Sequence, residues 1–331
     1  MKSDEILLLT SREVQTLLTL DECIQAVEHA FRCQGEGKTA TPGVLSMHAH
    51  DGAFHVKAGF LDLGRQYFAA KVNGNFPQNG NRFGLPTIQG IVVLCDSENG
   101  TPLAVMDSRE ITSLRTGAAT AVAARYLARS NSSTATICGC GNQGRVQLRA
   151  IARVCRLRTA FAYDSSTEHA ARFARDMTSE LKIPVTAVAD LSPAMLESDV
   201  CVTCTTSRYP FLGPDQVRPG TFVAAVGADN PQKQEIHPGL MAKSKIVCDI
   251  TEQCAAMGDL HHALDAAAVT RANVHAELGE VVAGKRPGRE TAEEITIFDS
   301  TGMALQDVAA AAFLYEKAQR IGSGVRLNLA A

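Results

Sequence analysis

The sequence predicts an α/β protein in which a Rossmann-type parallel sheet is joined to an α+β domain built from both ends of the chain. Three features support this fold class. Strand-like and helix-like segments alternate from residue 134 onwards, a glycine-rich turn follows the first of these strands, and a block of short strands precedes them. Regular alternation is typical of a parallel sheet that helices cover on both faces.

The first elements are expected to be helices. Residues 10–13 and 19–22 both match the capping box, in which a Thr hydroxyl and a Glu side chain bond each other's backbone amides. Apolar residues recur at helical spacing after the second box. Gly35 and Gly37 are expected to end this helix, because glycine commonly terminates helices.

Short strands separated by Gly, Pro, Asn and Asp are expected between residues 41 and 106. The strand-like segments are VLSMHAH, AFHVKAGF, YFAAKVN, TIQGIVVLCD and PLAVMD. They predict an antiparallel or mixed sheet with a helix in front of it. Residues 111–128 then form an Ala-rich helix that is apolar nearly all round, so we expect it to be buried.

From residue 134 the pattern becomes β-α-β. The expected strands are TATIC, TAFAYD, PVTAV, DVCVTCTT, TFVAAVGAD, KIVCDI and EITIFDS. A final long helix is expected over GMALQDVAAAAFLYEKAQRI. Because both chain ends flank the β-α-β block, one domain is expected to be assembled from the two termini.

Length, composition and charge narrow the class of protein. The 331 residues favour about two domains, and 45% hydrophobic with 20% charged residues is ordinary for a globular protein. The net charge of −3 gives no general attraction to nucleic acid or membranes. Arg145, Arg149 and Arg153 share one helix face, which we interpret as a solvated stripe. No run of about 18 apolar residues exists, and the acidic start does not resemble a signal peptide, so we expect a cytoplasmic protein.

The ten cysteines are expected to be reduced thiols in such a protein. Cys201 and Cys204 form a C-x-x-C pair, but they fall in a predicted strand whose residues three apart face opposite ways. Zinc would require a second ligand pair at matching spacing, so no metal site is expected. Cys138 and Cys140 are interpreted as small residues that fill space around the glycine turn.

The glycine turn has the pattern of a dinucleotide site. Gly139, Gly141 and Gly144 form G-x-G-x-x-G between a strand and a helix. The first permits a tight turn, the second allows backbone to approach a pyrophosphate, and the third allows close helix packing. The helix amides near Asn142 and Gln143 are expected to face the phosphates. The alternative is a glycine turn with a purely structural role.

Asp164 bears on which cofactor binds. It lies twenty residues after Gly144, at the end of the next predicted strand. A carboxylate there accepts hydrogen bonds from ribose hydroxyls and repels a 2′-phosphate. NAD(H) is therefore favoured, and the small neutral Ser165 and Ser166 leave NADP(H) as the alternative.

Three charged residues outside the turn are candidates for chemistry. Lys71 lies among apolar residues in a predicted strand, Arg115 lies in the predicted buried helix, and Asp229 ends a strand where a switch-point crevice opens. Buried charges are costly unless they are paired or used. Each belongs either to an internal ion pair or to a site where Lys71 and Arg115 hold a small anionic substrate over the nicotinamide. Asp229 would then exchange a proton or stabilise a developing positive charge.

Several longer segments add a family likeness. They are AAKVNGNFPQN, GLPTIQG, GTPLAVMDSREITSLRTGAA, YLARSNSS, GCGNQGRVQ, VGADNPQKQE, ELGEVVAGKRPGRE and EITIFDSTGMALQDVA. On these segments the chain resembles the ornithine cyclodeaminase/μ-crystallin family over essentially its whole length. The resemblance implies a substrate-binding and dimerisation domain of residues 1–115 with 303–331, an NAD(P)-binding Rossmann domain of residues 116–302, and a homodimer.

The resemblance also implies roles for single residues. Lys71 matches the lysine that binds the substrate carboxylate and transfers a proton, and Arg115 matches the arginine between cofactor and substrate. Asp229 matches the aspartate that serves the substrate amine in cyclodeaminases. The other matches are cofactor positions: Thr116 near the phosphates, Asn142 and Gln143 in the turn, Asp164 at the ribose, Val226, Gly227 and Ala228 beneath the nicotinamide, and Lys233 and Ser300 at nearby polar positions.

Two departures from the family pattern affect the substrate. The family commonly has Met-Pro where this chain has Lys57 and Ala58. Many members also carry an upstream arginine as a second carboxylate clamp, which PGVLSMHAH lacks, so we consider His48, His55 and Lys57 as replacements. Cyclodeaminase-like members tend to have Gly-Gly-Asp where this chain has Gly-Ala-Asp, so the chain is closer to the dehydrogenase and reductase branch.

These interpretations predict an NAD(P)H-dependent oxidoreductase acting on small α-imino or α-amino acids. The best single prediction is a ketimine reductase that converts Δ1-pyrroline-2-carboxylate to L-proline. The alternatives are an ornithine cyclodeaminase that uses NAD internally, an alanine dehydrogenase, and a μ-crystallin-like nucleotide-binding protein. The expected partners are a small-molecule substrate and a second copy of the chain, with no nucleic acid and no membrane.

Overall fold

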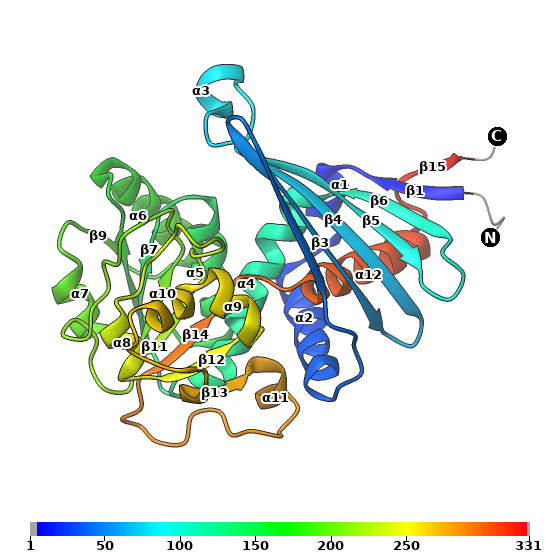
Figure 1. Ribbon diagram of the computed structural model, residues 1–331. Coiled ribbons are helices and arrows are strands. Elements are labelled where there is room, and N and C mark those ends of the chain that lie inside the picture. Colours follow the sequence, from blue (N-terminus) through cyan, green and yellow to red (C-terminus); the bar gives the residue numbers. More distant parts are fainter. Residues whose placement is uncertain (1–4, 330–331) are drawn as a thin grey trace. The chain divides into compact units, whose positions relative to one another are not determined.

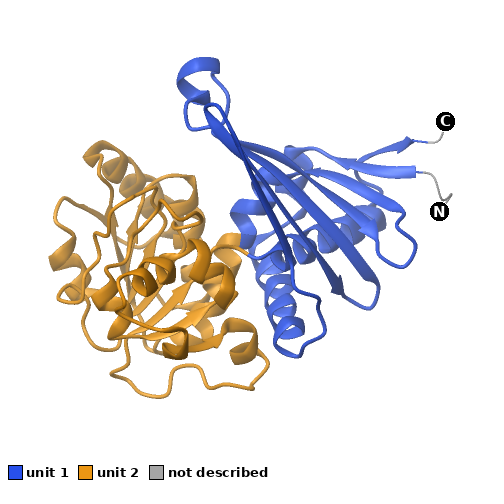
Figure 2. Cartoon of the chain, viewed as in Figure 1, with its two compact units in different colours: residues 1–115, 303–331 blue, residues 116–302 orange. Residues whose placement is uncertain are grey.

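The structure is a computed structural model that describes residues 5–329 (Figure 1). The chain forms two compact units, residues 1–115 with 303–331 and residues 116–302 (Figure 2). The division falls inside helix α4 (Ser108–Leu127). The substrate-binding, dimerisation and dinucleotide-binding roles predicted for these parts of the chain stay predictions.

The first unit contains a seven-stranded mixed sheet in the order β15-β1-β6-β5-β4-β3-β2. Strand β1 pairs with β6 in parallel, and the other neighbours are antiparallel. The mixed sheet that the sequence predicts is therefore confirmed. The strands are β1 (Glu5–Leu9), β2 (Gly43–Ala49), β3 (Gly52–Asp62), β4 (Gln66–Asn75), β5 (Ile88–Asp96), β6 (Pro102–Asp107) and β15 (Val325–Asn328).

Helices cover one face of this sheet. They are α1 (Ser11–Leu17), α2 (Leu20–Gly35) and α12 (Ala304–Ile321), whereas the short α3 (Asn79–Phe83) lies in the connection between β4 and β5 (Figure 1). The capping boxes predicted at Thr10 and Thr19 are both formed. Helix α12 packs on β3, β4 and α2, so the C-terminal helix completes a core begun by the N-terminal residues (Figure 1).

The expectation that the chain begins with helices is wrong for its first described element. Residues 5–9 form β1, between β6 and β15. An apolar run as short as EILLL has no decisive periodicity, and here its state depends on strands about a hundred and three hundred residues away. The partner β15 was not predicted either, because its pairing is equally long-range.

The second unit is an eight-stranded sheet whose paired strands all run parallel, in the order β13-β12-β14-β11-β10-β7-β8-β9. Helices lie on both of its faces (Figure 1), which confirms the predicted Rossmann-type domain. The strands are β7 (Thr134–Cys138), β8 (Thr159–Tyr163), β9 (Val185–Val188), β10 (Val200–Thr203), β11 (Phe222–Ala225), β12 (Lys245–Cys248), β13 (Val274–Glu277) and β14 (Thr296–Asp299).

The strand order reverses between β7 and β10. From β7 the chain builds β8 and β9 on one side and then β10 and β11 on the other. Ligands of open parallel sheets bind at such a point, outside the carboxyl ends of the strands. The helices of this unit besides α4 are α5 (Asn142–Val154), α6 (Thr167–Leu181), α7 (Leu191–Glu197), α8 (Pro238–Ala242), α9 (Thr251–Met257), α10 (Asp259–Asp265) and α11 (Leu278–Val282), with a 3₁₀ turn at Arg271–Asn273.

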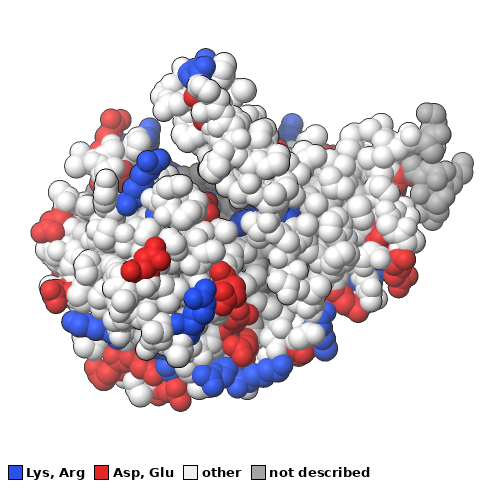
Figure 3. All heavy atoms as spheres, viewed as in Figure 1, with Lys and Arg blue, Asp and Glu red and all other residues white. Residues whose placement is uncertain are grey.

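Surface charge in the described residues is mixed. Acidic and basic side chains are interspersed over the face that Figure 3 shows, in keeping with the net charge of −3. Arg145 pairs with Asp176 and Arg149 pairs with Glu180, between α5 and α6. Arg145 and Arg149 are thus paired with acids of α6, and the interpretation of the arginines as a solvated stripe stays a prediction. None of the helices in the described residues has the length and hydropathy needed to span a bilayer.

Candidate active site

The glycine turn after β7 has the geometry that its sequence predicts. Gly139 adopts φ +102°, and a Cβ there would lie 2.9 Å from the Cys204 carbonyl oxygen. A Cβ on Gly144 would lie 2.1 Å from the Gly139 carbonyl oxygen. Neither position accepts a larger residue without moving backbone, so both glycines are required for the strand to turn sharply into α5.

Gly141 differs from the other two glycines because it faces open space. A Cβ built there meets no atom within 4 Å, and the residue is the N-cap of the thirteen-residue helix α5. Asn142 and Gln143 are the first residues of that helix. Backbone amides at a helix N-terminus beside uncrowded space suit the pyrophosphate of a dinucleotide.

Asp164 lies directly after β8 and borders the same space. Its Oδ2 accepts a hydrogen bond from the Cys140 amide at 2.8 Å, and its Oδ1 accepts one from the Ser166 amide at 2.9 Å. These bonds hold the carboxylate beside the glycine turn, and each oxygen keeps a further lone pair for a ribose hydroxyl. Ser166 itself caps α6 through the His169 amide at 3.3 Å.

A pocket of about 520 Å³ opens at this point of the second unit. Gly139, Gly141, Asp164 and Ser165 form one wall. The opposite wall follows β10 and was not predicted from the sequence. Its residues are Cys204, Thr205, Thr206, Ser207 and Phe211. This wall could have been predicted, because ligands of open parallel sheets bind where the strand order reverses. The loop after the fourth strand, β10, faces the glycine turn at that point.

The segment after β11 carries the predicted Asp229. Its side chain is half-exposed, and its Oδ1 accepts hydrogen bonds from the Lys233 amine at 2.8 Å and the Asn230 amide at 3.2 Å. The Lys233 amine also donates to the Gly227 carbonyl at 3.3 Å. The Lys233 amine therefore links two residues of this segment, Gly227 and Asp229. Its role near the cofactor stays a prediction.

Among the predicted cofactor positions, Ser300 is buried and Thr116 is half-buried. The Ser300 hydroxyl donates to the buried carboxylate of Asp249 at 3.0 Å, and the residue itself is 4% exposed. Thr116 is half-buried in α4, as are Val226 and Gln143 in their own segments. Their roles toward a cofactor also stay predictions.

In the first unit, Lys71 and Arg115 meet on a third residue, Asp307 of α12. The Lys71 amine lies 2.9 Å from Asp307 Oδ1 and 2.7 Å from Oδ2. Arg115 Nε lies 3.2 Å from Oδ1, and its Nη1 donates to Gln306 Oε1 at 2.8 Å. The three charged residues are 3%, 6% and 1% exposed. An internal ion pair, one of the two readings the sequence left open, is thus present.

Burial sets the protonation states of this cluster. It is the largest cause that lowers the pKa of Lys71 from 10.5 to about 7, and the neighbouring Arg115 lowers it further while Asp307 opposes both. Burial also raises the pKa of Asp307, but attraction to Lys71 and Arg115 outweighs it, so this pKa lies below its usual 3.8. At neutral pH Asp307 is therefore ionised, and Lys71 is close to the midpoint between its protonated and neutral forms.

Lys57 adds a further positive charge on the same sheet face. It pairs directly with Lys71 across β3 and β4, is half-buried, and lowers the pKa of Lys71. His55 lies two residues away on that face and hydrogen-bonds Ser46 at 3.0 Å. His48 is exposed and lies about four residues along β2 from the residue opposite Lys57, a span of about 13 Å. The register thus brings Lys57, but not His48, beside Lys71.

The family model for the ornithine cyclodeaminase/mu-crystallin family matches residues 4–322. The chain belongs to this family. Alanine dehydrogenase of Archaeoglobus fulgidus is 40% identical over 97% of this chain and 98% of its own length. Iminosuccinate reductase of Paracoccus denitrificans is 35% identical over 96% of this chain and 98% of its own length.

Two solved structures of family members match nearly the whole chain. An archaeal alanine dehydrogenase dimer with bound NAD has a TM-score of 0.94 at 40% identity, covering 98% of this chain and 99% of that one. Thermococcus litoralis Δ1-pyrroline-2-carboxylate reductase, in complex with NADH and L-proline, has a TM-score of 0.92 at 34% identity, covering 97% and 99%.

Family resemblance pointed to Lys71 and Arg115, but Asp307 and Gln306 were missed. The available signal was a single acid inside the otherwise apolar run MALQDVAAAA. An acid placed in a helix that is buried on most sides requires a cationic partner. The cations Lys71 and Arg115 supply that partner.

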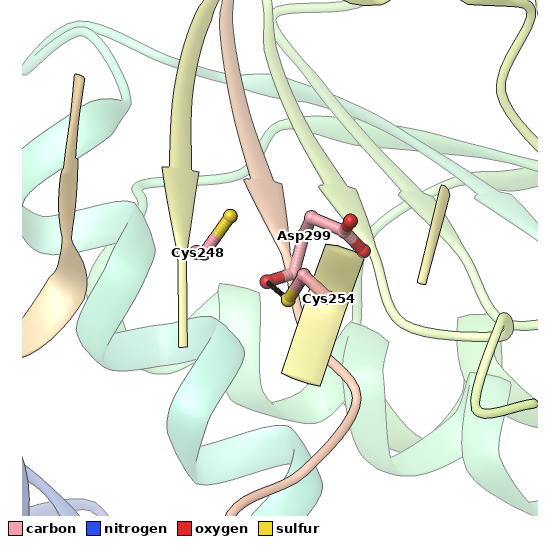
Figure 4. Close-up of side chains that lie close together, drawn as sticks. All are labelled: Cys248, Cys254 and Asp299. Carbon is pink, nitrogen blue, oxygen red and sulfur yellow. Dashed lines mark hydrogen bonds between the residues drawn. The ribbon is translucent and has the colours of Figure 1, made fainter. Parts of the chain in front are cut away.

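A cluster of Cys248, Cys254 and Asp299 lies at the carboxyl end of β12 and β14 (Figure 4). The Cys254 thiol donates to the Asp299 carbonyl at 3.3 Å, and the Asp299 carboxylate accepts the Leu260 amide at 2.8 Å. Burial raises the pKa of Cys254 well above its usual value, which opposes thiolate formation. We therefore interpret this cluster as part of the packed core of the sheet.

The ten cysteines are all free thiols, as expected. Cys201 is buried within β10, whereas Cys204 follows the strand and lines the pocket. Cys138 and Cys140 are buried at the start of the glycine turn. Their thiols fill space there, as the sequence predicts.

Proposed function

We propose that this family member is an NAD(H)-dependent oxidoreductase that reduces small α-imino acids, with Δ1-pyrroline-2-carboxylate to L-proline as the leading reaction. The observation that carries the proposal is the buried cluster in which Lys71 and Arg115 share the single carboxylate of Asp307. With Lys71 protonated, the cluster holds one more positive than negative charge. A small carboxylate is the ligand that such a surplus favours.

The dinucleotide-binding residues proposed here are those of the glycine turn and the loops around it. Gly141, Asn142 and Gln143 bind the pyrophosphate through backbone amides, and Asp164 accepts hydrogen bonds from the ribose hydroxyls. Thr116, Ser165, Ser166, Lys233, Ser300 and residues 226–228 complete the proposed cofactor contacts. Bound NADH supplies the hydride for reduction of the imine carbon. The NAD-bound and NADH-bound relatives support this cofactor.

The proposed role of Arg115 is to bind and orient the substrate carboxylate. Its planar guanidinium forms paired, charge-assisted hydrogen bonds with a carboxylate. The neighbouring bond from Arg115 to Gln306 and the contact with Asp307 hold the guanidinium in one orientation. Lys57 and Lys71 add charge on the same side, so Lys57 takes the part of the second clamp that the sequence lacks.

The proposed role of Lys71 is to exchange the proton of the reaction. Reduction of an imine places a hydride on carbon and a proton on nitrogen. A lysine with a pKa of about 7 donates that proton at neutral pH, whereas an ordinary lysine at 10.5 holds it too tightly. Asp229 stabilises the positive charge of the iminium, or takes part in the same proton exchange.

We also propose that the working unit is a homodimer. Phe54, Phe60, Val72 and Ile91 are 36–48% exposed on the face of the mixed sheet opposite Lys71. Contiguous exposed apolar groups of this kind are typical of an interface. The archaeal relative solved as a dimer supports a second copy of the chain as the partner.

Alanine dehydrogenation is a second candidate, which the 40% identity to an archaeal alanine dehydrogenase favours. The iminosuccinate reductase relative similarly favours an acyclic imino acid. Both reactions use the same carboxylate and proton chemistry. Ornithine cyclodeamination differs, because it releases ammonia with no net change in NADH.

A screen of NADH and NADPH oxidation at 340 nm tests the proposal. The substrates are Δ1-pyrroline-2-carboxylate, Δ1-piperideine-2-carboxylate, and pyruvate with ammonia, and L-ornithine is assayed for ammonia release. We expect NADH oxidation with at least one imino acid and no ammonia release from L-ornithine. Ammonia release from L-ornithine without net NADH change selects the cyclodeaminase instead.

A further inference from the structure

Glu235 is a buried acid that the proposed reaction does not use. It lies in the segment after β11, is 0% exposed, and its carboxylate accepts four hydrogen bonds. Oε1 accepts the Thr205 amide at 2.6 Å and the Thr205 hydroxyl at 2.7 Å. Oε2 accepts the Thr203 hydroxyl at 2.7 Å and the Gly227 amide at 2.9 Å.

The partners of Glu235 belong to two different segments of the dinucleotide-binding unit. Thr205 follows β10 and lines the pocket opposite the glycine turn. Gly227 follows β11, in the segment that leads to Asp229. The Glu235 carboxylate therefore binds both the loop after β10 and the loop after β11. These two strands lie on the other side of β7 from β8.

The Glu235 carboxylate explains why position 227 is a glycine. A Cβ at position 227 would lie 2.5 Å from both Glu235 oxygens. The Gly227 amide thus approaches Glu235 more closely than any other residue type allows. The glycine of the Gly-Ala-Asp segment is explained by its contact with Glu235.

Glu235 is itself held in place by the first residue of helix α10. Asp259 Oδ1 accepts the Glu235 amide and the Ile236 amide, both at 2.8 Å. The Asp299 carboxylate, at the end of β14, accepts the Leu260 amide at 2.8 Å. Buried carboxylates therefore connect the carboxyl ends of β10, β11 and β14 through backbone amides and hydroxyls.

We infer that Glu235 is a positioning residue for dinucleotide binding, which sets the loops at Thr205 and Gly227 at the spacing that NAD(H) requires. This inference rests on the proposed function, because it assumes that NAD(H) binds beside these loops. All four partners donate, so both oxygens of Glu235 act as acceptors, and a side-chain amide in the same place would offer only one acceptor oxygen.

Three single variants test this role through NADH affinity. Glu235→Gln keeps the shape but replaces one acceptor oxygen by a donor, so one of the two loops loses its anchor. Thr203→Val removes the 2.7 Å bond without touching the pocket, since Thr203 is 0% exposed. Asp199→Asn is the matched control. Asp199 is also buried and accepts the Ser133 and Thr134 amides, but it lies at the opposite end of β10.

NADH dissociation constants are measured by fluorescence titration at 20 °C, with circular dichroism checking that each variant is folded. We expect the Kd to rise about tenfold in Glu235→Gln and about threefold in Thr203→Val, and to stay unchanged in Asp199→Asn despite a lower unfolding midpoint. If Glu235→Gln does not fold, the NADH Kd of Thr203→Val is compared with that of Asp199→Asn to test the inference. The inference is overturned if Thr203→Val, and Glu235→Gln where it folds, bind NADH with the wild-type Kd. It is also overturned if the NADH Kd of Asp199→Asn rises in proportion to the stability that this variant loses. Neither outcome affects the proposed function. A wild-type protein that does not bind NADH overturns the proposed function as well.

Discussion

The Lys71 amine lies 2.7 Å from a carboxylate oxygen of Asp307, although 236 residues separate the two positions in the chain. The contact joins β4 to α12 inside the first unit. Arg115 approaches the same carboxylate at 3.2 Å. Asp307 therefore neutralises one of the two buried cations, and the cluster keeps one net positive charge while Lys71 is protonated.

Replacing Asp307 by Asn is expected to lower both stability and activity. Removing one partner of a buried ion pair costs about 3–5 kcal/mol, so the urea midpoint of unfolding falls. The pKa of Lys71 falls below about 7, because Asp307 normally raises it. Arg320→Gln, an exposed change on the same helix, serves as the control. Wild-type stability and an unmoved pH profile in Asp307→Asn contradict this account of the cluster.

The rate of imine reduction is expected to depend on pH through Lys71. The reaction requires the protonated amine, so kcat/KM is constant below pH about 7 and falls as the pH rises above it. The measurement is kcat/KM from pH 5.5 to 9.5 with saturating NADH. A profile that stays level to pH 9 rules out Lys71 as the proton donor.

The same pKa predicts a stability difference with a definite sign. Between pH about 7 and 10.5 the unfolded chain keeps a lysine proton that the folded chain has released. Stability rises with pH wherever the unfolded state binds more protons. The free energy of unfolding of the wild type, relative to Lys71→Met, is therefore expected to increase over this range. Denaturation at pH 7, 8 and 9 measures it, and a difference that decreases with pH is the opposite outcome.

Asp164→Ser is expected to relax the preference for NADH over NADPH. The carboxylate beside the glycine turn accepts ribose hydroxyls and repels a 2′-phosphate. Its loss should lower the KM for NADPH and raise that for NADH, each by about tenfold. Glu168→Gln, an exposed acid in the first turn of α6, is the control. An unchanged ratio of the two KM values shows that Asp164 does not contact the ribose.

A charge on the exposed apolar face of the mixed sheet is expected to separate the proposed dimer. Val72→Asp places a carboxylate beside Phe54 and Ile91, where burial against a second copy would desolvate it. Light scattering after size exclusion should give twice the chain mass for the wild type and the chain mass for the variant. Leu196→Asp, exposed on the second unit, should remain dimeric. A wild type that elutes as a monomer contradicts the dimer directly.

Much of the fold follows from local sequence patterns. Both predicted capping boxes form, and the seven strands predicted in the β-α-β block are present within a few residues. These elements carry their own signals, namely helix caps, glycine turns and apolar runs of strand length. Strands β1, β13 and β15 were missed because each is short and is specified by partners far away in the chain.

The candidate site divides in the same way. The glycine turn and Asp164 were predicted because their spacing is local, and Lys71 and Arg115 because charges in apolar segments are conspicuous. Asp307 and Glu235 were not predicted, since the meaning of each depends on residues brought near by folding. The distance between His48 and Lys57 along β2 and β3 could not be read from the sequence, because the hairpin sets the strand register.

Turnover and cofactor binding measured together in Lys71→Ala and Arg115→Ala test the central claim most directly. Arg109→Ala, a half-buried position in the first turn of the same helix as Arg115, is the control. We expect NADH oxidation with the best imino acid to fall by about two orders of magnitude or more in both variants, while the Kd for NADH stays within about threefold of the wild type. Near-normal turnover in both variants on every imino acid tested would contradict the claim that this buried cation pair binds the substrate.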